Sequence, residues 1–234
     1  MGVTGFDSYT PAVDELVKSG GRGVTTPAAA AAAVEILLIM VSNDAQVTSV
    51  LFEPGTGAIH TLPKHAAVII SSTVPPSYYE KVRARLDIEF QRQDVHLLDC
   101  PVSGGTARAA NGTLSIFSSG PEAGLAVAHP VLVALSAILY KIPGGIGFGS
   151  KAKMCHQVLP EMDIALVAEV MALAARAGLN AQEVFHAVQA SHGASWIIGN
   201  RVPHMLENDK TVYSAIQNSW KDSVRIQSED TTKS

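Results

Sequence analysis

The stretch GFGSKAKMCHQVLPEMDIALVAEVMALAARAG, residues 147–178, decides the fold of this chain. Ser150 is a suitable N-terminal cap and Gly178 a suitable residue just past the C-terminal end, so we expect one helix of about 27 residues, or ~40 Å. A helix of that length crosses a whole domain. Its second half, 158–177, is apolar on nearly every side, which predicts burial in a core or in an interface between subunits.

Three polar side chains share one face at the start of this predicted helix. Lys153, His156 and Gln157 are spaced three and four residues apart. An ammonium near the buried end of an apolar helix must lose its hydration, pair with an opposite charge or take part in a reaction. A lysine whose pKa is lowered by burial exchanges protons near neutral pH. Lys153 is therefore the first candidate catalytic residue. Two alternatives stay open: Lys153 can extend its ammonium into water, and His156 can be a hydrogen-bonded core residue.

Upstream of residue 147, apolar runs alternate with helical segments. The apolar runs predict strands at 3–7, 36–41, 67–71, 95–99, 113–118 and 138–142. Proline and Asn-Asp start signals predict intervening helices that begin at Thr10, Thr26, Asn43, Pro75 and Pro121. This alternation predicts a parallel α/β sheet with helices on both faces. After residue 147 every segment reads as helical, including 181–191, 194–207 and 214–226, so we expect a domain boundary near Gly147.

Composition excludes several functional classes. The chain has 234 residues, is 47% hydrophobic and carries a net charge of −4, with its basic residues scattered. We therefore expect no nucleic-acid partner and no membrane surface, and the histidines have no spacing that suggests a metal site. Cys100 and Cys155 form no CxxC pair and no disulfide framework, which favours a reducing compartment, by default the cytoplasm.

A second informative stretch is DCPVSGG, residues 99–105. It follows a predicted strand at its carboxyl end, which is where ligands bind in open α/β sheets. The backbone amides of Ser103, Gly104 and Gly105 could form an anion-binding nest for a substrate carboxylate, and the Ser103 hydroxyl adds a donor. The alternative is an ordinary loop rich in proline and glycine.

Together, the DCPVSGG stretch and the pattern GxGxxxKxxHQ at 147–157 resemble the β-hydroxyacid dehydrogenase family, to which 3-hydroxyisobutyrate and L-threonate dehydrogenases belong. The family is related to 6-phosphogluconate dehydrogenase. The resemblance extends over nearly the whole chain and includes residues 40–44, 71–73, 172–178, 195–201 and 220–222. Relatives acting on 3-hydroxyisobutyrate carry asparagine at the position of His156, so the His-Gln pair is most similar to the L-threonate branch.

The resemblance implies reversible hydride transfer between NAD(P) and a small hydroxy acid. Lys153 would be the general acid/base, because an alkoxide is too basic to form unaided. Ser103, Gly104 and Gly105 would hold the substrate carboxylate. His156 would orient the reacting hydroxyl, with Gln157 as a further substrate-binding residue.

The resemblance also implies a set of cofactor-binding residues. Met40 and Val41 would contact the nucleotide, and Thr73 and Lys221 would face the nicotinamide. Asp7 would bind the ribose hydroxyls, which favours NAD while leaving NADP possible. Alternatively, Thr73 caps the following helix and Lys221 belongs to a solvated surface pair.

The chain departs from the family pattern at both ends. It starts at what resembles the second strand, without the first strand and its Gly-x-Gly-x-Met-Gly turn, and the last family helices are absent after about Ile226. Residues 1–146 would thus be a Rossmann-like NAD(P)-binding domain lacking its phosphate-binding turn. Residues 147–234 would be a shortened helical domain for substrate binding and oligomerisation, kinked at Pro160.

Two hypotheses follow from these departures. The first is an NAD-dependent hydroxy acid dehydrogenase, expected to be a homo-oligomer assembled through its helical domain. The second is a catalytically inactive relative that acts as a binding or oligomerisation partner.

Overall fold

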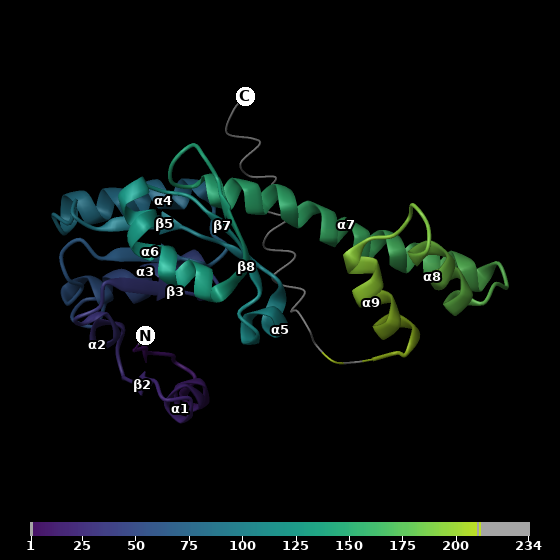
Figure 1. The fold of residues 1–234 in the computed structure, drawn as a ribbon, viewed down its shortest axis with the longest axis horizontal. Coiled ribbons are helices and arrows are strands. Elements are labelled where there is room, and N and C mark those ends of the chain that lie inside the picture. Colours follow the sequence, from purple (N-terminus) through teal and green to yellow (C-terminus); the bar gives the residue numbers. More distant parts are fainter. Residues whose placement is uncertain (1, 210, 212–234) are drawn as a thin grey trace. The chain divides into compact units, whose positions relative to one another are not determined.

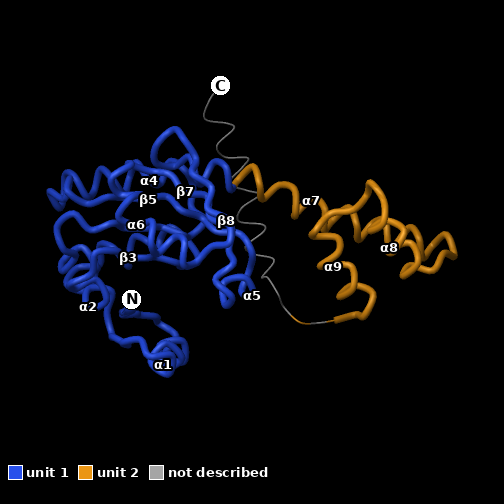
Figure 2. Tube along the Cα trace, in the orientation of Figure 1, with its two compact units in different colours: residues 1–153 blue, residues 154–234 orange. Residues whose placement is uncertain are grey.

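The computed structural model describes residues 2–209 and 211. It divides into two compact units, residues 1–153 and 154–234 (Figure 2). The division falls inside the long helix α7 (Phe148–Arg176), which begins two residues before Ser150 and continues through Pro160. Ser150 is therefore inside the helix, and the prediction that it is the N-cap is wrong.

The centre of the first unit is a parallel sheet of β3 (Ile36–Ile39), β4 (Ala67–Ile70) and β5 (His96–Asp99), in the order β3-β4-β5 (Figure 1). In the register, Ile39 faces Ile70 and Ile70 faces Asp99. All three strands therefore end at the same edge, so the segments that follow them leave the sheet side by side.

Helices cover both faces of this sheet, as the alternation predicts. Val68 and Ile70 of β4 pack in one apolar cluster with α3 (Asp44–Phe52) and α4 (Pro76–Ala84). Ala67 and Ile69, which point the other way, pack in a second cluster with α6 (Glu122–Leu135). A strand buried on both faces must be apolar at every position, which explains its continuous apolar run.

A second sheet continues the first unit. β6 (Val102–Ser103) runs antiparallel to β7 (Leu114–Ser118), and β8 (Ser136–Lys141) runs parallel to β7. An antiparallel bridge between Asp99 and Ser119 joins the end of β5 to the residue after β7. Residues 100–106, expected as a loop, contain β6 and the start of the short helix α5 (Gly105–Ala110).

The N-terminal strands stand apart from the central sheet. Within the part of the chain that the structure describes, β1 (Thr4–Gly5) and β2 (Arg22–Gly23) pair only with each other, and α1 (Thr10–Lys18) connects them (Figure 1). The expected strand at 3–7 is thus shorter than predicted and lies in its own two-stranded sheet. Two residues per strand form few ladder hydrogen bonds, so this pair is a weak sheet by itself.

Shorter elements complete the first unit. They are the helix α2 (Pro27–Ala31), a 3₁₀ turn at Ala58–His60, and a π-helical turn at Arg85–Glu89 that follows α4. The helix predicted to run from Pro75 to about residue 91 is therefore α4 and this π turn.

The second unit contains the rest of α7, with α8 (Ala181–Gln189) and α9 (Trp196–Leu206). Its core is formed by Val167, Met171, Phe185, Ile197, Ile198 and Val202. The opposite side of α7 is also apolar but exposed, so the expectation of burial on every side does not hold within the unit. The helix expected at 214–226 lies outside the described residues.

Candidate active site

The start of α7 is held by side chains from distant parts of the first unit. The Gly149 amide donates to Ser119 Oγ at 2.8 Å, and the Ser150 amide donates to Asp99 Oδ2 at 2.7 Å. The Ser150 hydroxyl donates to Asp99 Oδ1 at 2.8 Å, and the Ser119 hydroxyl to Oδ2 at 3.2 Å. Asp99, Ser119 and Ser150 are all at most 1% exposed. The helix therefore begins on a buried, hydrogen-bonded carboxylate.

Gly149 is required for this close approach. A Cβ atom at this position would overlap the carbonyl oxygen of Phe117 and would lie 2.8 Å from the carbonyl oxygen of Asp99. Glycine thus brings the helix backbone against the ends of β5 and β7, where any larger residue would push it away.

Burial dominates the electrostatics of this cluster. Desolvation raises the pKa of the Asp99 carboxyl, while hydrogen bonds from the backbone and side chain of Ser150, and then from Ser119, lower it in part. Burial and the Asp99 charge raise the pKa of Tyr79 well above its usual value. Burial likewise raises the pKa of the Cys100 thiol, so this cysteine is not a reactive nucleophile.

Lys153 lies one turn after Ser150 and is only 6% exposed. A lysine that simply extends its ammonium into water would be more exposed, so the structure does not favour that alternative. His156 and Gln157 follow on the next turn of α7 and are intermediate in exposure. Their spacing along one continuous helix places them on the face of Lys153.

The candidate carboxylate site, residues 103–105, is a turn between β6 and α5. Ser103 pairs with Ser115 of β7, and Gly104 and Gly105 have φ angles of 139° and 68°, which favour glycine. The stem of Arg108 packs along Gly104, because a Cβ there would lie 2.7–3.2 Å from the Arg108 side chain. Sequence reasoning missed Arg108, since it did not predict α5, whose first turn places residue 108 beside residue 104.

The expected cofactor residues that the structure describes lie in two places. Met40 and Val41 follow β3, and Thr73 follows β4 after Ser71 and Ser72, so these positions share the carboxyl edge of the central sheet. The Val41 amide donates to the Ser72 hydroxyl at 2.8 Å, which ties the two strand ends together. Met40 is 59% exposed.

Of the other two expected cofactor residues, Asp7 does not belong to this edge and Lys221 lies outside the described part of the chain. Asp7 follows β1 in the separate two-stranded sheet, is exposed, and accepts a hydrogen bond from the Tyr9 amide through Oδ1 at 2.8 Å. The structure thus brings Met40, Val41 and Thr73 to one edge and leaves Asp7 in another sheet.

The fit of these residues to a dinucleotide is partial. The glycine-rich turn at 144–147 precedes α7, which is the arrangement that binds a pyrophosphate elsewhere. Here the amides of Gly149 and Ser150 donate to Ser119 and Asp99, and the buried carboxylate takes the place an anion would need. The amides after this turn therefore bind side chains of the protein and are not available to a phosphate. The residues that fit a cofactor are those at the carboxyl ends of β3 and β4.

Along the described part of the chain, no helix combines the length and apolarity needed to cross a lipid bilayer.

Comparison with known proteins covers both units. Residues 1–145 match the family model for the NAD binding domain of 6-phosphogluconate dehydrogenase. Residues 147–231 match the model for the NAD-binding domain of NADP-dependent 3-hydroxyisobutyrate dehydrogenase. Both models describe nicotinamide-dinucleotide domains, which confirms NAD(P) as the cofactor class.

Individual relatives agree with these matches. L-threonate dehydrogenase of Cupriavidus necator is 37% identical over 87% of this chain and 67% of its own length, and that of Escherichia coli K12 is 37% identical over 93% and 71%. A crystal structure of 3-hydroxyisobutyrate dehydrogenase from Salmonella typhimurium superimposes with a TM-score of 0.87 at 34% identity, covering 98% of this chain and 78% of that one. With the α/β unit, the helical unit and the lysine helix between them, these matches show that the chain belongs to the β-hydroxyacid dehydrogenase family.

Proposed function

We propose that this chain interconverts a small hydroxy acid and its carbonyl form, with NAD(P) as the hydride carrier and Lys153 as the general acid/base. The observation that carries the proposal is the burial of Lys153 on the first turns of α7, in the unit that also contains the 103–105 turn. A buried lysine amine in the same unit as a candidate carboxylate site suits proton exchange with a substrate hydroxyl.

The proton has a defined route in this proposal. The neutral amine of Lys153 takes the hydroxyl proton as the hydride leaves the adjacent carbon and becomes an ammonium, which returns the proton when the reaction runs backwards. Bound NAD(P) supplies the hydride acceptor and donor. A positioned lysine stabilises the developing alkoxide, which would otherwise be too basic to form.

Substrate binding is assigned to two elements. The Ser103 hydroxyl and the amides of Gly104 and Gly105 hold the carboxylate, and the Arg108 stem supports Gly104 from behind. His156 orients the reacting hydroxyl, and Gln157 contacts the remaining polar groups. The two curated relatives are L-threonate dehydrogenases, and the His-Gln pair is the sequence feature that supports a sugar acid of that class.

Cofactor binding is assigned first to the carboxyl edge of β3 and β4, where Met40 and Val41 contact the nucleotide and Thr73 faces the nicotinamide. Two further roles come from the family resemblance: Lys221 faces the nicotinamide, and Asp7, which follows β1 in the separate sheet, accepts hydrogen bonds from ribose hydroxyls. A carboxylate at the ribose would repel a 2′-phosphate, so NAD is the expected cofactor, with NADP possible. The cytoplasm is the expected compartment.

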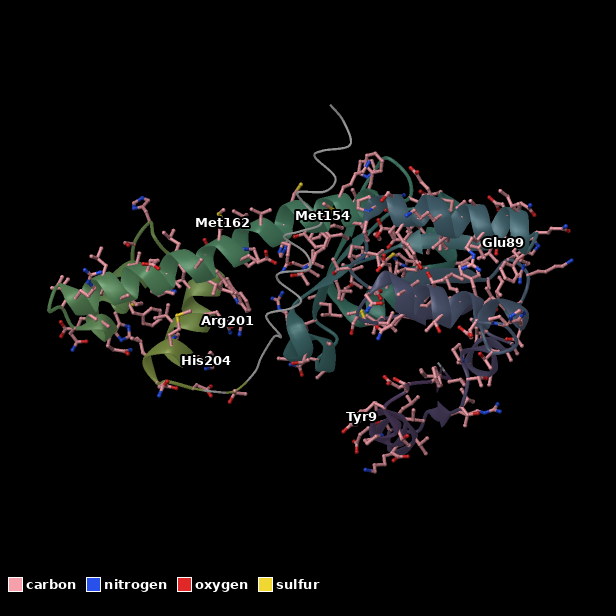
Figure 3. All side chains as sticks on the ribbon, turned by 180° about the vertical axis from the view of Figure 1, so that it is seen from behind. Tyr9, Glu89, Met154, Met162, Arg201 and His204 are labelled. Carbon is pink, nitrogen blue, oxygen red and sulfur yellow. The ribbon has the colours of Figure 1, made fainter. Side chains whose placement is uncertain are left out.

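A homo-oligomer is part of the proposal. Four side chains on one side of α7 are between 63% and 68% exposed: Leu159, Met162, Leu166 and Leu173. Figure 3 shows the side chains of this helix, with Met162 labelled. We call these four residues the apolar stripe. A row of exposed apolar side chains of this kind supports contact with a second copy of the chain.

The test is a titration of the purified chain with NADH, followed by nicotinamide fluorescence. Saturable binding, then turnover with a panel of three- and four-carbon hydroxy acids, is the expected result. Absence of saturation up to about 1 mM cofactor, the upper end of usual KM values, would rule out the enzyme function for this chain.

Two observations favour a second candidate, a catalytically inactive relative that acts as a binding or oligomerisation partner. β1 and β2 pair only with each other, and the amides at the start of α7 are bonded to Ser119 and Asp99. The same titration separates the candidates, because this second candidate predicts a stable oligomer that does not bind NADH.

A further inference from the structure

We propose that Asp99 is a positioning residue that caps α7 from a distant strand and so fixes the turn carrying Lys153. The inference rests on the proposed role of Lys153, which Asp99 would support without touching the substrate. Ser119 is its partner in this cap.

The first step of the argument is the hydrogen bonding at the helix start. A helix leaves its first amides without partners inside the helix, and a nearby polar side chain usually accepts one of them. In α7 two such amides, those of Gly149 and Ser150, donate to side chains 30 and 51 positions earlier in the chain. The cap is therefore a tertiary contact, and the helix can start here only if β5 and β7 are in place.

The second step concerns charge. A carboxylate is favoured at the positive end of a helix dipole, and the Asp99 carboxylate accepts three hydrogen bonds from Ser150 and Ser119. Burial without those donors would be costly, whereas with them the carboxylate is held in one orientation. The first turn of α7 is thus oriented by an anion built into the protein.

The third step connects the cap to the site. Asp99 is the last residue of β5, and the stretch that follows it leads directly to Ser103, Gly104 and Gly105. Asp99 and Ser119 exchange backbone hydrogen bonds of 3.0 and 2.8 Å, which anchors the strand end. One residue therefore holds both the strand that leads to the carboxylate turn and the helix that carries Lys153.

Three variants separate positioning from general stability. Asp99→Asn keeps the shape but replaces one acceptor oxygen by a donor, which opposes the donors of Ser150 and Ser119. Ser119→Ala removes the acceptor for the Gly149 amide and one donor to Asp99 Oδ2, and it leaves both hydrogen bonds from Ser150 in place. Ser118→Ala is the matched control, because Ser118 is equally buried and adjacent, yet its hydroxyl donates to the Tyr140 carbonyl at 3.0 Å.

The first readout is amide hydrogen exchange of the full chain, resolved by residue. We expect Asp99→Asn to speed exchange at Gly149–Lys153 by about tenfold or more relative to Leu98 and Ile116, the effect of losing a hydrogen bond to a charged group. Ser119→Ala should also speed exchange of the Gly149 amide. Ser118→Ala should leave exchange at residues 149–153 unchanged relative to Leu98 and Ile116. Equal acceleration at all these amides would overturn the proposal, because it would mean that Asp99 serves only overall stability.

The second readout is labelling of lysine amines with an acylating reagent, mapped by peptide mass spectrometry. Buried Lys153 should react slowly in the wild type and at least several-fold faster in Asp99→Asn, while exposed Lys151 serves as the internal reference. An unchanged ratio of Lys153 to Lys151 labelling in a folded variant would also overturn the proposal. If Asp99→Asn does not fold, amide exchange and lysine labelling of Ser119→Ala test the proposal in its place.

Neither readout needs cofactor or substrate. A chain that fails to bind NADH would therefore defeat the proposed function and leave the cap testable, whereas uniform exchange would defeat the cap alone. In a chain that turns over, Asp99→Asn should lower kcat with little change in NADH affinity.

Discussion

Lys153 is the residue on which the proposed proton transfer depends. It is buried, and two residues earlier on the same helix Lys151 is exposed with its ammonium 4.2 Å from the centre of the Phe148 ring. The two lysines therefore have different environments despite their proximity. This contrast supplies a matched pair of variants.

Lys153→Ala should abolish most of the turnover, by about 10²–10⁴-fold, with little change in NADH affinity, since a general acid/base acts mainly in the transition state. The measurement is kcat with the best hydroxy acid, alongside the NADH fluorescence titration. Lys151→Ala should keep both values close to wild type. A Lys153→Ala variant with normal kcat would remove this residue from the mechanism.

Gly149→Ala should destabilise the first unit by about 1–3 kcal/mol, because the added methyl group would overlap the Phe117 carbonyl in a tightly packed contact. Urea denaturation followed by circular dichroism measures this change. Gly2→Ala, at a position with no heavy atom within 4 Å of the added carbon, is the control and should leave the midpoint unchanged. Equal midpoints for the two variants would show that α7 is not held by this close approach.

At the scale of elements, an ion pair between Arg92 and Asp94 joins two of the connections around the central sheet. Arg92 donates to the carbonyls of Leu62 and Pro63 and, through Nε, to Asp94 at 2.8 Å, and Asp94 Oδ2 accepts from the His65 amide at 2.9 Å. The turn before β4 is thereby joined to the turn before β5. Both side chains are less than 20% exposed, so water screens the pair only in part.

This pair should make stability depend on pH in a defined direction. The hydrogen bond from Arg92 is the main cause that holds the pKa of Asp94 well below its usual value of 3.8. A lowered pKa in the folded state stabilises the fold above pH 3.8, and this contribution is lost as the pH falls through the folded pKa.

Asp94→Asn should therefore reduce the free energy of unfolding by about 1–2 kcal/mol at pH 7 and by progressively less below pH 3.8. Denaturation series at several pH values measure the difference from wild type. Glu15→Gln, which breaks an ion pair with Lys18 in which both side chains are about 70% exposed, should have almost no effect. A loss that is the same at pH 7 and in acid would contradict the ionic explanation.

At the scale of the whole molecule, the apolar stripe is the feature that a single copy leaves unused. On the other side of the same helix, Val167, Met171 and Ala174 are buried in the second unit. The helix therefore has two apolar sides, of which the core covers one and the apolar stripe is exposed. Large apolar side chains that remain exposed in a row favour association.

Leu166→Glu should weaken self-association by about tenfold or more, because a charge would be placed in the centre of the proposed contact. Sedimentation velocity across a concentration series measures the association. Val17→Glu, an equally drastic change at a residue of α1 that is 52% exposed, should leave the oligomer intact. A wild-type chain that sediments as a monomer at every concentration would rule out the stripe as an interface.

The sequence by itself determined the elements whose signals are local. The apolar runs of β3, β4 and β5 and the proline and asparagine start signals of α1, α2 and α3 were each predicted within a few residues. The alternation of these elements was enough for the α/β class, and the paired motifs at 99–105 and 147–157 were enough for the family. These features can be recognised in the sequence because secondary structure depends on the spacing of apolar side chains and on capping residues, both of which involve only a few neighbouring positions.

Only the tertiary structure decided how those elements meet. Serine is a common N-cap residue, but the side chains that accept the first amides of α7 are those of Ser119 and Asp99. Gly149 lets the helix backbone approach the ends of β5 and β7 closely enough for these hydrogen bonds. Likewise β1 pairs with β2 and not with the central sheet. Hydrogen bonds between residues 30 to 51 positions apart leave no periodic trace in the sequence, because their geometry depends on how separate strands and helices pack.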